Sequence, residues 1–276
     1  MPTSIESRFE AFRAAHPPIH VPRPEPWTYI RGGREGPAVL LLGGALGVAE
    51  FAFTAITALE RRARVIAPDY PAASDLDSLV RGLAAVLDHA GVDRAVVAGG
   101  SYGGLVAQAF ARMHPERTHS LILSHTGAPE PMRGRRWAVR LLEMIPEVVL
   151  RALLRRRLAT ALRGADPFWL EQFHAIVSGL SGAAILSRVR IAAEAGDRFG
   201  REPLGPVPYP VLIVEADDDP FFPQAERAAL HRLYPGAEVH TFHGTGHLAA
   251  VVASERFASV LLDFISRHGA LGQREP

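Results

Sequence analysis

Short apolar segments without alternating polar residues recur along the chain, and amphipathic helical segments separate them. The apolar segments that we expect to form strands are residues 27–31, 38–42, 63–67, 95–98, 120–124, 211–214 and 238–242. The helices expected between and after them are residues 50–59, 74–90, 103–113, 224–233 and 254–266. A strand that is apolar on both sides needs helices on both faces of its sheet. The pattern therefore predicts an α/β fold with a doubly wound, mostly parallel sheet.

The strand pattern stops over one long stretch in the middle of the chain. Between residues 128 and 206 only helical patterns occur, at about 147–162, 166–177 and 183–195. An all-helical block between two strands of one sheet indicates an insertion that forms a lid over the core. We therefore expect a core made of residues 1–127 and 207–276, with 128–206 as a helical lid. A chain of 276 residues, 48% of them hydrophobic, is long enough for this arrangement.

The composition excludes several kinds of chemistry. The chain has no cysteine, which rules out disulfides, thiolate metal sites and a cysteine nucleophile. All 30 basic residues are arginine, so a lysine that forms a Schiff base or binds phosphate is also ruled out. The formal net charge of +1 gives no basic field for nucleic acid. No apolar stretch can span a bilayer and the N-terminal residues do not form a secretory signal, so we expect a cytoplasmic protein.

The strongest chemical signal is Gly99-Gly100-Ser101-Tyr102-Gly103, which lies between an expected strand and an expected helix. A Gly-x-Ser-x-Gly sequence at such a turn forces the serine into a strained conformation, with its hydroxyl clear of the sheet. The N–H of Tyr102, at the start of the helix, then points to where an oxyanion would form. We interpret Ser101 as a candidate nucleophile.

This motif, and its continuation Gly104-Leu105-Val106-Ala107-Gln108, resembles the α/β-hydrolase-fold family. The resemblance covers nearly the whole chain and is greatest to small lid-bearing serine hydrolases, with some likeness to the maspardin-like branch. It implies a triad in the order serine, acid, histidine. It also implies that the acid lies several residues beyond the strand 211–214, which selects Asp219 over Asp217 and Asp218.

The histidine of the triad would follow the last strand, in His243-Gly244-Thr245-Gly246-His247. The resemblance assigns the base to His247. His243 and His247 are not expected to bind a metal, because no third ligand is near them in a segment broken by glycine. His125, after the strand 120–124, is expected at the rim of the site as a substrate contact.

The loop that follows the strand 38–42 is expected to complete the oxyanion hole. In Gly43-Gly44-Ala45-Leu46-Gly47, position in the family selects the N–H of Ala45 as the second donor beside Tyr102. Gly44 is the alternative donor and an expected substrate contact. The loop does not match the Gly-x-Gly-x-x-Gly register of a dinucleotide site, so no nicotinamide cofactor is expected.

Together these features predict a serine hydrolase that cleaves an ester or a related acyl bond without a metal or organic cofactor. The apolar composition of residues 128–206 favours an apolar small-molecule substrate. Three alternatives stay open: a thioesterase, a carbon–carbon bond hydrolase with the same triad, and a non-catalytic maspardin-like binding protein. Residues 128–206 contain 13 arginines and 8 acidic residues, so an acidic carrier protein is a further candidate partner.

Overall fold

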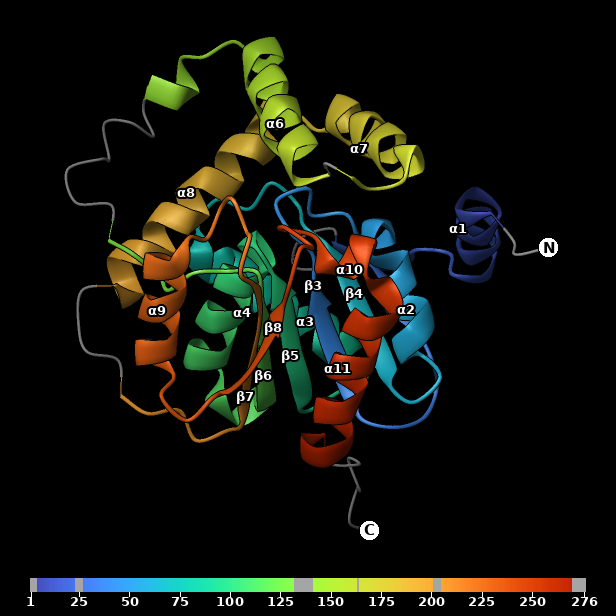
Figure 1. The fold of residues 1–276 in the computed structure, drawn as a ribbon, viewed down its shortest axis with the longest axis vertical. Coiled ribbons are helices and arrows are strands. Elements are labelled where there is room, and N and C mark those ends of the chain that lie inside the picture. The colour runs from blue at the N-terminus through green and yellow to red at the C-terminus, as the bar shows by residue number, and fades with distance from the viewer. Residues whose placement is uncertain (1–3, 23–26, 132–140, 163, 201–204, 270–276) are drawn as a thin grey trace.

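A computed structural model of the chain describes residues 4–22, 27–131, 141–162, 164–200 and 205–269, and one eight-stranded sheet forms its centre (Figure 1). The strands are β1 (Ile19–Val21), β2 (Trp27–Gly32), β3 (Ala38–Leu42), β4 (Arg64–Asp69), β5 (Ala95–Gly100), β6 (Thr118–Ser124), β7 (Val211–Ala216) and β8 (Glu238–Phe242). Their order across the sheet is β1-β2-β4-β3-β5-β6-β7-β8. The pairs β1–β2 and β2–β4 are antiparallel, whereas all the others are parallel. The predicted mostly parallel sheet is confirmed.

Helices cover both faces of the sheet. They are α1 (Ile5–Ala15), α2 (Phe53–Leu59), α3 (Leu76–His89), α4 (Tyr102–Met113), α6 (Glu147–Ala161), α7 (Pro167–Gly179), α8 (Gly182–Phe199), α9 (Gln224–Leu233), α10 (Ala249–Val252) and α11 (Ser254–His268), with short 3-10 turns at Ala49–Ala52 and Pro115–Arg117. Buried side chains of α3, α4, α8 and α9 pack in the core on one face. Those of α1, α2, α7 and α11 pack in the core on the other face. The doubly wound arrangement follows from this packing.

Helix α3 shows how the sequence directs this packing. The Asp75 carboxylate accepts a hydrogen bond from the Ser78 N–H at 2.7 Å, and the Ser78 hydroxyl accepts one from the Asp75 N–H at 3.2 Å. This reciprocal pair satisfies backbone donors that the first turn leaves free. Leu79, Leu83 and Val86 recur at helical spacing and are buried against the sheet.

Helices α6, α7 and α8 come between β6 and β7 in the chain and lie beyond the carboxyl ends of the parallel strands (Figure 1). Hydrogen bonds join α8 to the core: the Ser187 hydroxyl donates to the Ala73 carbonyl at 2.6 Å, and Glu194 accepts from the Leu76 N–H at 2.7 Å. Residues 132–140, 163 and 201–204 of the expected insertion lie outside the described residues. Within the described ranges no single helix is long and apolar enough to cross a membrane, although α7 and α8, bent by 98°, pass that test of length and composition together.

Candidate active site

Ser101 stands between β5 and α4 in a backbone conformation that few residues adopt. Its φ is 53° and its ψ is −120°, in the left-handed half of backbone space. The turn is tight because glycines let its two arms approach. A Cβ at Gly99 would lie 2.1 Å from the Gly103 carbonyl oxygen, and one at Gly103 would lie 2.2 Å from the Leu42 carbonyl oxygen. The expected strand-to-helix turn is present, with Ser101 at its apex.

His247 and Asp219 lie next to Ser101 although they are more than 100 residues away in sequence. The Asp219 carboxylate is 2.9 Å from Nδ1 of His247 and can only accept, so Nδ1 carries the proton. Nε2 is then the acceptor for the Ser101 hydroxyl, at 3.0 Å. Asp219 and His247 are both buried. The structure therefore brings the three residues that the sequence singled out into one hydrogen-bonded chain.

The three consecutive aspartates bond to three different residues of the loop that carries His247. Asp217 contacts Nδ1 of His243 at 2.6 Å, and this pair is largely exposed. Asp218 accepts a hydrogen bond from the Gly246 N–H at 3.0 Å. The two preceding aspartates therefore support the loop, and Asp219 faces His247.

The environment of Asp219 favours its ionised form. Burial alone would raise the pKa of this carboxyl, but the hydrogen bond from His247, the charge of that ring and the Phe221 N–H together lower it below its ordinary value. The rings of Phe221 and Phe222 flank His247, with centroids 4.8 and 5.7 Å from that of the imidazole. Sequence reasoning missed both phenylalanines, because only their position directly after Asp219-Pro220 connects them with the site.

Gly44 lies beside the nucleophile, in the loop expected to form the oxyanion hole. A Cβ at Gly44 would be 3.9 Å from that of Ser101. The loop turns back on itself at this point, because the Gly47 N–H donates to the Gly44 carbonyl at 2.9 Å. On the opposite side Tyr102 opens α4, and N–H groups in the first turn of a helix have no intrahelical acceptor. Ala45 is in the wall of the same cavity as Ser101.

Two residues that the sequence did not single out hold this loop from behind. The Tyr70 hydroxyl donates to the Gly43 carbonyl at 3.0 Å, and the Tyr70 N–H donates to the Gly47 carbonyl at 2.8 Å. Arg188 of α8 is buried and donates to the carbonyls of Leu46 and Tyr70, each at 3.3 Å. No sequence pattern marks an arginine that donates to backbone carbonyls, and the sequence therefore did not predict this role of Arg188.

His125 is buried and lines the same cavity as Ser101. It follows Ser124 at the end of β6 with a φ of 46°, and only 4% of its surface is exposed. Its Nδ1 lies 2.8 Å from the Ser124 hydroxyl, whereas its buried Nε2 has no hydrogen-bond partner among the described residues. Burial, assisted by the neighbouring His247, lowers the pKa of His125 to about 4. The ring is therefore neutral at pH 7.

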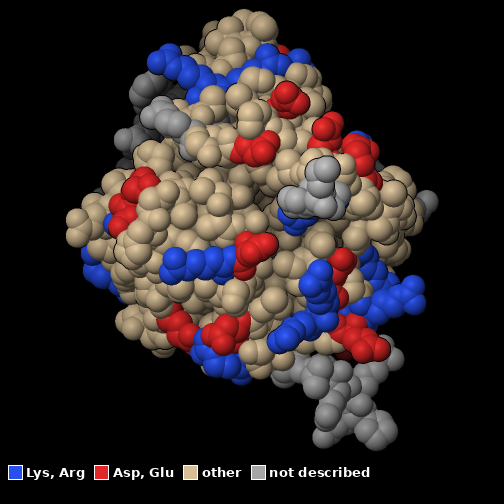
Figure 2. All heavy atoms as spheres, turned by 45° about the vertical axis from the view of Figure 1, so that its right-hand side comes forward, with Lys and Arg blue, Asp and Glu red and all other residues tan. Residues whose placement is uncertain are grey.

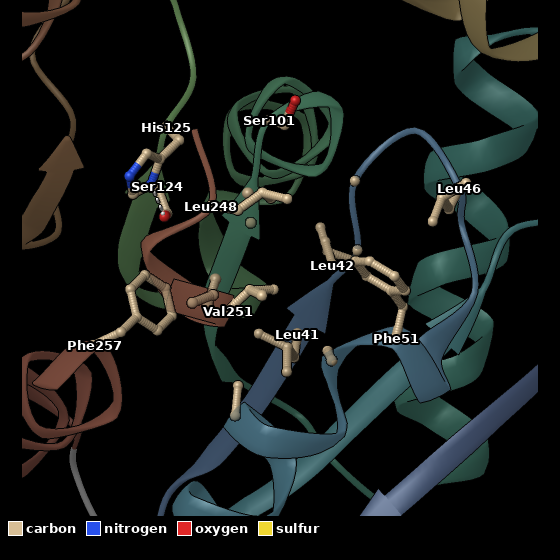
Figure 3. Close-up of a pocket in the computed structure, with 18 of the residues that line it drawn as sticks. Leu41, Leu42, Leu46, Phe51, Ser101, Ser124, His125, Leu248, Val251 and Phe257 are labelled. Carbon is tan, nitrogen blue, oxygen red and sulfur yellow. Dashed lines mark hydrogen bonds between the residues drawn. The ribbon is translucent and has the colours of Figure 1, made fainter. Parts of the chain in front are cut away.

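A cavity of about 180 Å³ extends from Ser101 into the core (Figure 3). Its wall is mostly apolar. In Figure 3 Ser101 lies at the top of the view, and Leu41, Val251 and Phe257 lie below it. Leu162 and Phe173 close it on the side of the helical insertion. No arginine, aspartate or glutamate of the described residues lines this space.

Within the described ranges, no three His, Asp or Glu side chains converge as ligands for a metal ion. On the face shown in Figure 2, basic and acidic side chains are interspersed. On α6, Arg156 is exposed, Arg155 donates to the Ser178 hydroxyl, and Arg157 stacks over the Phe221 ring at 5.1 Å. An acidic carrier protein as partner stays a prediction from composition.

Comparison with known proteins gives relatives of one fold. The chain is 28% identical over 254 residues to a 2-hydroxy-6-oxononadienedioate/2-hydroxy-6-oxononatrienedioate hydrolase of Burkholderia vietnamiensis, a match that covers 83% of this chain and 86% of that protein. The structure of this chain is similar to that of a thermophilic esterase from Thermogutta terrifontis, with a TM-score of 0.77 and 20% identity. The match covers 92% of this chain and 99% of the esterase chain. This chain is also similar to an enol-lactonase from Burkholderia xenovorans LB400, with a TM-score of 0.73, 18% identity and coverage of 87% and 96%.

The chain also matches a family model over most of its length. Residues 37–253 match the model of the alpha/beta hydrolase fold. That range includes six of the eight strands, β3 to β8, and leaves out β1 and β2. It also contains the turn at Ser101 and the loop that carries His247. This chain is an enzyme of the α/β-hydrolase fold family.

Proposed function

We propose that this enzyme hydrolyses esters or closely related acyl compounds through a covalent intermediate on Ser101. The observation that carries the proposal is the hydrogen-bonded chain Ser101–His247–Asp219 at the mouth of an apolar cavity, with both contacts at or below 3.0 Å. A serine hydroxyl is a weak nucleophile at neutral pH and needs a base within hydrogen-bond reach. Nε2 of His247 satisfies that requirement.

The reaction would proceed in two halves. Ser101 Oγ attacks the substrate carbonyl carbon while His247 takes its proton, and the carbonyl oxygen gains a negative charge. Backbone N–H groups of Ala45 and Tyr102 are the proposed donors to that oxygen. His247 then gives its proton to the leaving oxygen, which leaves an acyl ester on Ser101. Water attacks that ester with His247 again as base. The bond between the acyl carbon and Ser101 Oγ then breaks, His247 returns its proton to Oγ, and the acid product departs.

The remaining site residues have supporting roles in this proposal. Asp219 holds His247 in the tautomer that accepts the serine proton and stabilises the imidazolium. Gly44 leaves room for substrate beside Ser101, and the neutral His125 offers Nε2 as a hydrogen-bond partner for substrate. Helices α6 to α8, within residues 128–206, act as a lid that keeps bulk water from the cavity.

A carbon–carbon bond hydrolase is the second candidate, favoured by the relative from Burkholderia vietnamiensis whose name denotes a dioic acid substrate. Burying a carboxylate costs several kcal/mol unless a cation or several donors compensate it. The described wall of the cavity contains no arginine, and the guanidinium of Arg188 donates to backbone carbonyls. The cavity therefore suits a neutral apolar ester better than a dianionic substrate.

Covalent labelling tests the proposal. A fluorophosphonate should modify Ser101, and p-nitrophenyl butyrate should be hydrolysed. Ser101→Ala should abolish labelling and lower kcat on the order of a million-fold, the usual loss for a triad nucleophile. Ser120→Ala, which removes a buried hydroxyl of β6 outside the cavity wall, should retain both activities. Unchanged turnover in Ser101→Ala would refute the acyl-enzyme mechanism.

A further inference from the structure

The cavity beside Ser101 lies between the sheet and the helices α2 and α11. Leu41 of β3, Ala98 of β5 and Ile122 of β6 form its wall on the sheet side. Residues of α2 and α11 form the opposite wall, among them Phe257. The space therefore runs inward from the nucleophile, between the sheet and the layer of α2 and α11.

Its size and lining suit one apolar group. A protein cavity of about 150 Å³ lined by leucine, isoleucine and phenylalanine stays dry and binds benzene. This cavity has about 180 Å³ and a similar lining, with Leu41, Ile122 and Phe257 among its wall residues. It can accept a group of the size of one aromatic ring or of a short alkyl chain, and it is poorly suited to hold water.

The chemistry of the two half-reactions decides which part of a substrate can enter it. The leaving group departs from the side of His247, and the hydrolytic water must then occupy that same side to be activated. A dry apolar space cannot be the side from which water attacks. The acyl group, by contrast, stays in place through both half-reactions and needs no contact with water.

We infer that the inner cavity is the acyl pocket, and that the substrate is an ester whose acyl part is an apolar group about as large as one six-membered ring. This inference rests on the proposed acyl-enzyme mechanism and specifies its substrate class. The alcohol part lies on the His247 side of Ser101, the side from which it departs and at which water then attacks.

One side chain is shared by the pocket and by a groove on the surface. Thr54 of α2 lines the cavity and also lines a separate surface groove between α2 and α11. Only 7% of its surface is exposed, and its hydroxyl donates a long hydrogen bond of 3.4 Å to the Ala250 carbonyl. Thr54 is therefore the partition between the pocket and the outside, and it sets the longest acyl chain that the pocket accepts.

Two series of esters test the assignment of the acyl pocket: one varies the acyl part and the other varies the alcohol part. In the first series the leaving group is always p-nitrophenol and the acyl part is acetyl, butyryl, hexanoyl, benzoyl or decanoyl. In the second series acetate esters carry alcohols from methyl to hexyl. Each methylene transferred from water to an apolar site favours binding about fourfold. We expect kcat/KM to rise at least about tenfold from acetate to hexanoate or benzoate, to fall at decanoate, and to change little along the alcohol series.

Matched threonine variants test the partition. Thr54→Ala should raise the ratio of decanoate to hexanoate kcat/KM at least about fivefold, because the pocket then opens into the groove. Thr57→Ala, the same change one turn further along α2, lines only the groove and should leave the ratio unchanged. Ala55→Val, which adds two carbons to the wall of the pocket, should lower hexanoate turnover more than acetate turnover. An unchanged ratio in Thr54→Ala would refute its role as the partition.

The controls separate this inference from the proposed mechanism. If Ser101 reacts with fluorophosphonate but kcat/KM depends on the alcohol and not on the acyl chain, the acyl assignment is wrong and the mechanism stands. If Ser101 does not react and no ester is cleaved, the mechanism itself is wrong, and the acyl assignment fails with it.

Discussion

His125 should make the folded protein sensitive to mild acid. Burial lowers the pKa of this imidazole from its ordinary value of 6.5 to about 4, with a smaller contribution from His247, and Asp219 and Asp218 act in the opposite direction. Below pH 6.5 the unfolded chain binds a proton at this residue, whereas the folded protein does not do so until about pH 4. Stability that is fully present above pH 6.5 is therefore lost as the pH falls toward 4.

The magnitude follows from the two pKa values. Their difference is about 2.5, and each pKa unit corresponds to about 1.4 kcal/mol, so His125 alone should remove about 3 kcal/mol between pH 7 and pH 4. That loss is a large share of the roughly 5 to 15 kcal/mol that typically stabilises a domain. A residue that lines the active site thus has a measurable effect on folding.

His125→Asn isolates this contribution. Asparagine tolerates the left-handed backbone at this position, where φ is 46°, and it has no proton to gain. The free energy of unfolding in urea, followed by tryptophan fluorescence, should fall with acidification by about 3 kcal/mol less in this variant than in the wild type. His20→Asn, at an exposed histidine, should follow the wild type. Parallel stability curves for wild type and His125→Asn would refute the reasoning.

Three further outcomes are expected. Asp219→Asn should lower kcat for p-nitrophenyl butyrate on the order of 10⁴-fold. The same change at the two preceding aspartates should lower kcat far less, because these residues support the loop. Equal losses of kcat in all three variants would show that another residue is the acid of the triad. Gly99→Ala should lower the Tm or prevent folding, since its Cβ would lie 2.1 Å from a carbonyl oxygen, whereas Gly179→Ala meets no atom within 4 Å and should be neutral in a thermal melt. Tyr70→Phe removes the donor to the oxyanion loop and should reduce kcat roughly tenfold with little change in KM, the pattern of a lost transition-state contact; a change in KM alone would contradict this role.

Much of the fold follows from local pattern. The apolar runs at 38–42, 95–98 and 211–214 are recognisable because strands covered on both faces contain few polar residues. Elements without a periodic signal were missed. Strand β1 has only three residues, and α10 only four, so neither is long enough to show a period.

The candidate nucleophile was also predictable from a short segment. The turn around Ser101 depends on glycines within two residues of it, and the requirement that Gly99 and Gly103 lack a Cβ is local. The sequence alone thus determined the alternation of strands and helices, the position of the strand-to-helix turn, and the order in which serine, acid and histidine occur.

Only the tertiary structure decided which residues that are far apart in the sequence lie close together. Which of three consecutive aspartates faces His247 is a matter of how two loops far apart in sequence are aligned, and local residues carry no such information. The burial of His125, the use of Arg188 by backbone carbonyls, and the partition formed by Thr54 likewise arise only where helices pack on the sheet. A pattern along the chain reports which side of an element is apolar, whereas a cavity is a property of the several elements that fail to fill the space between them.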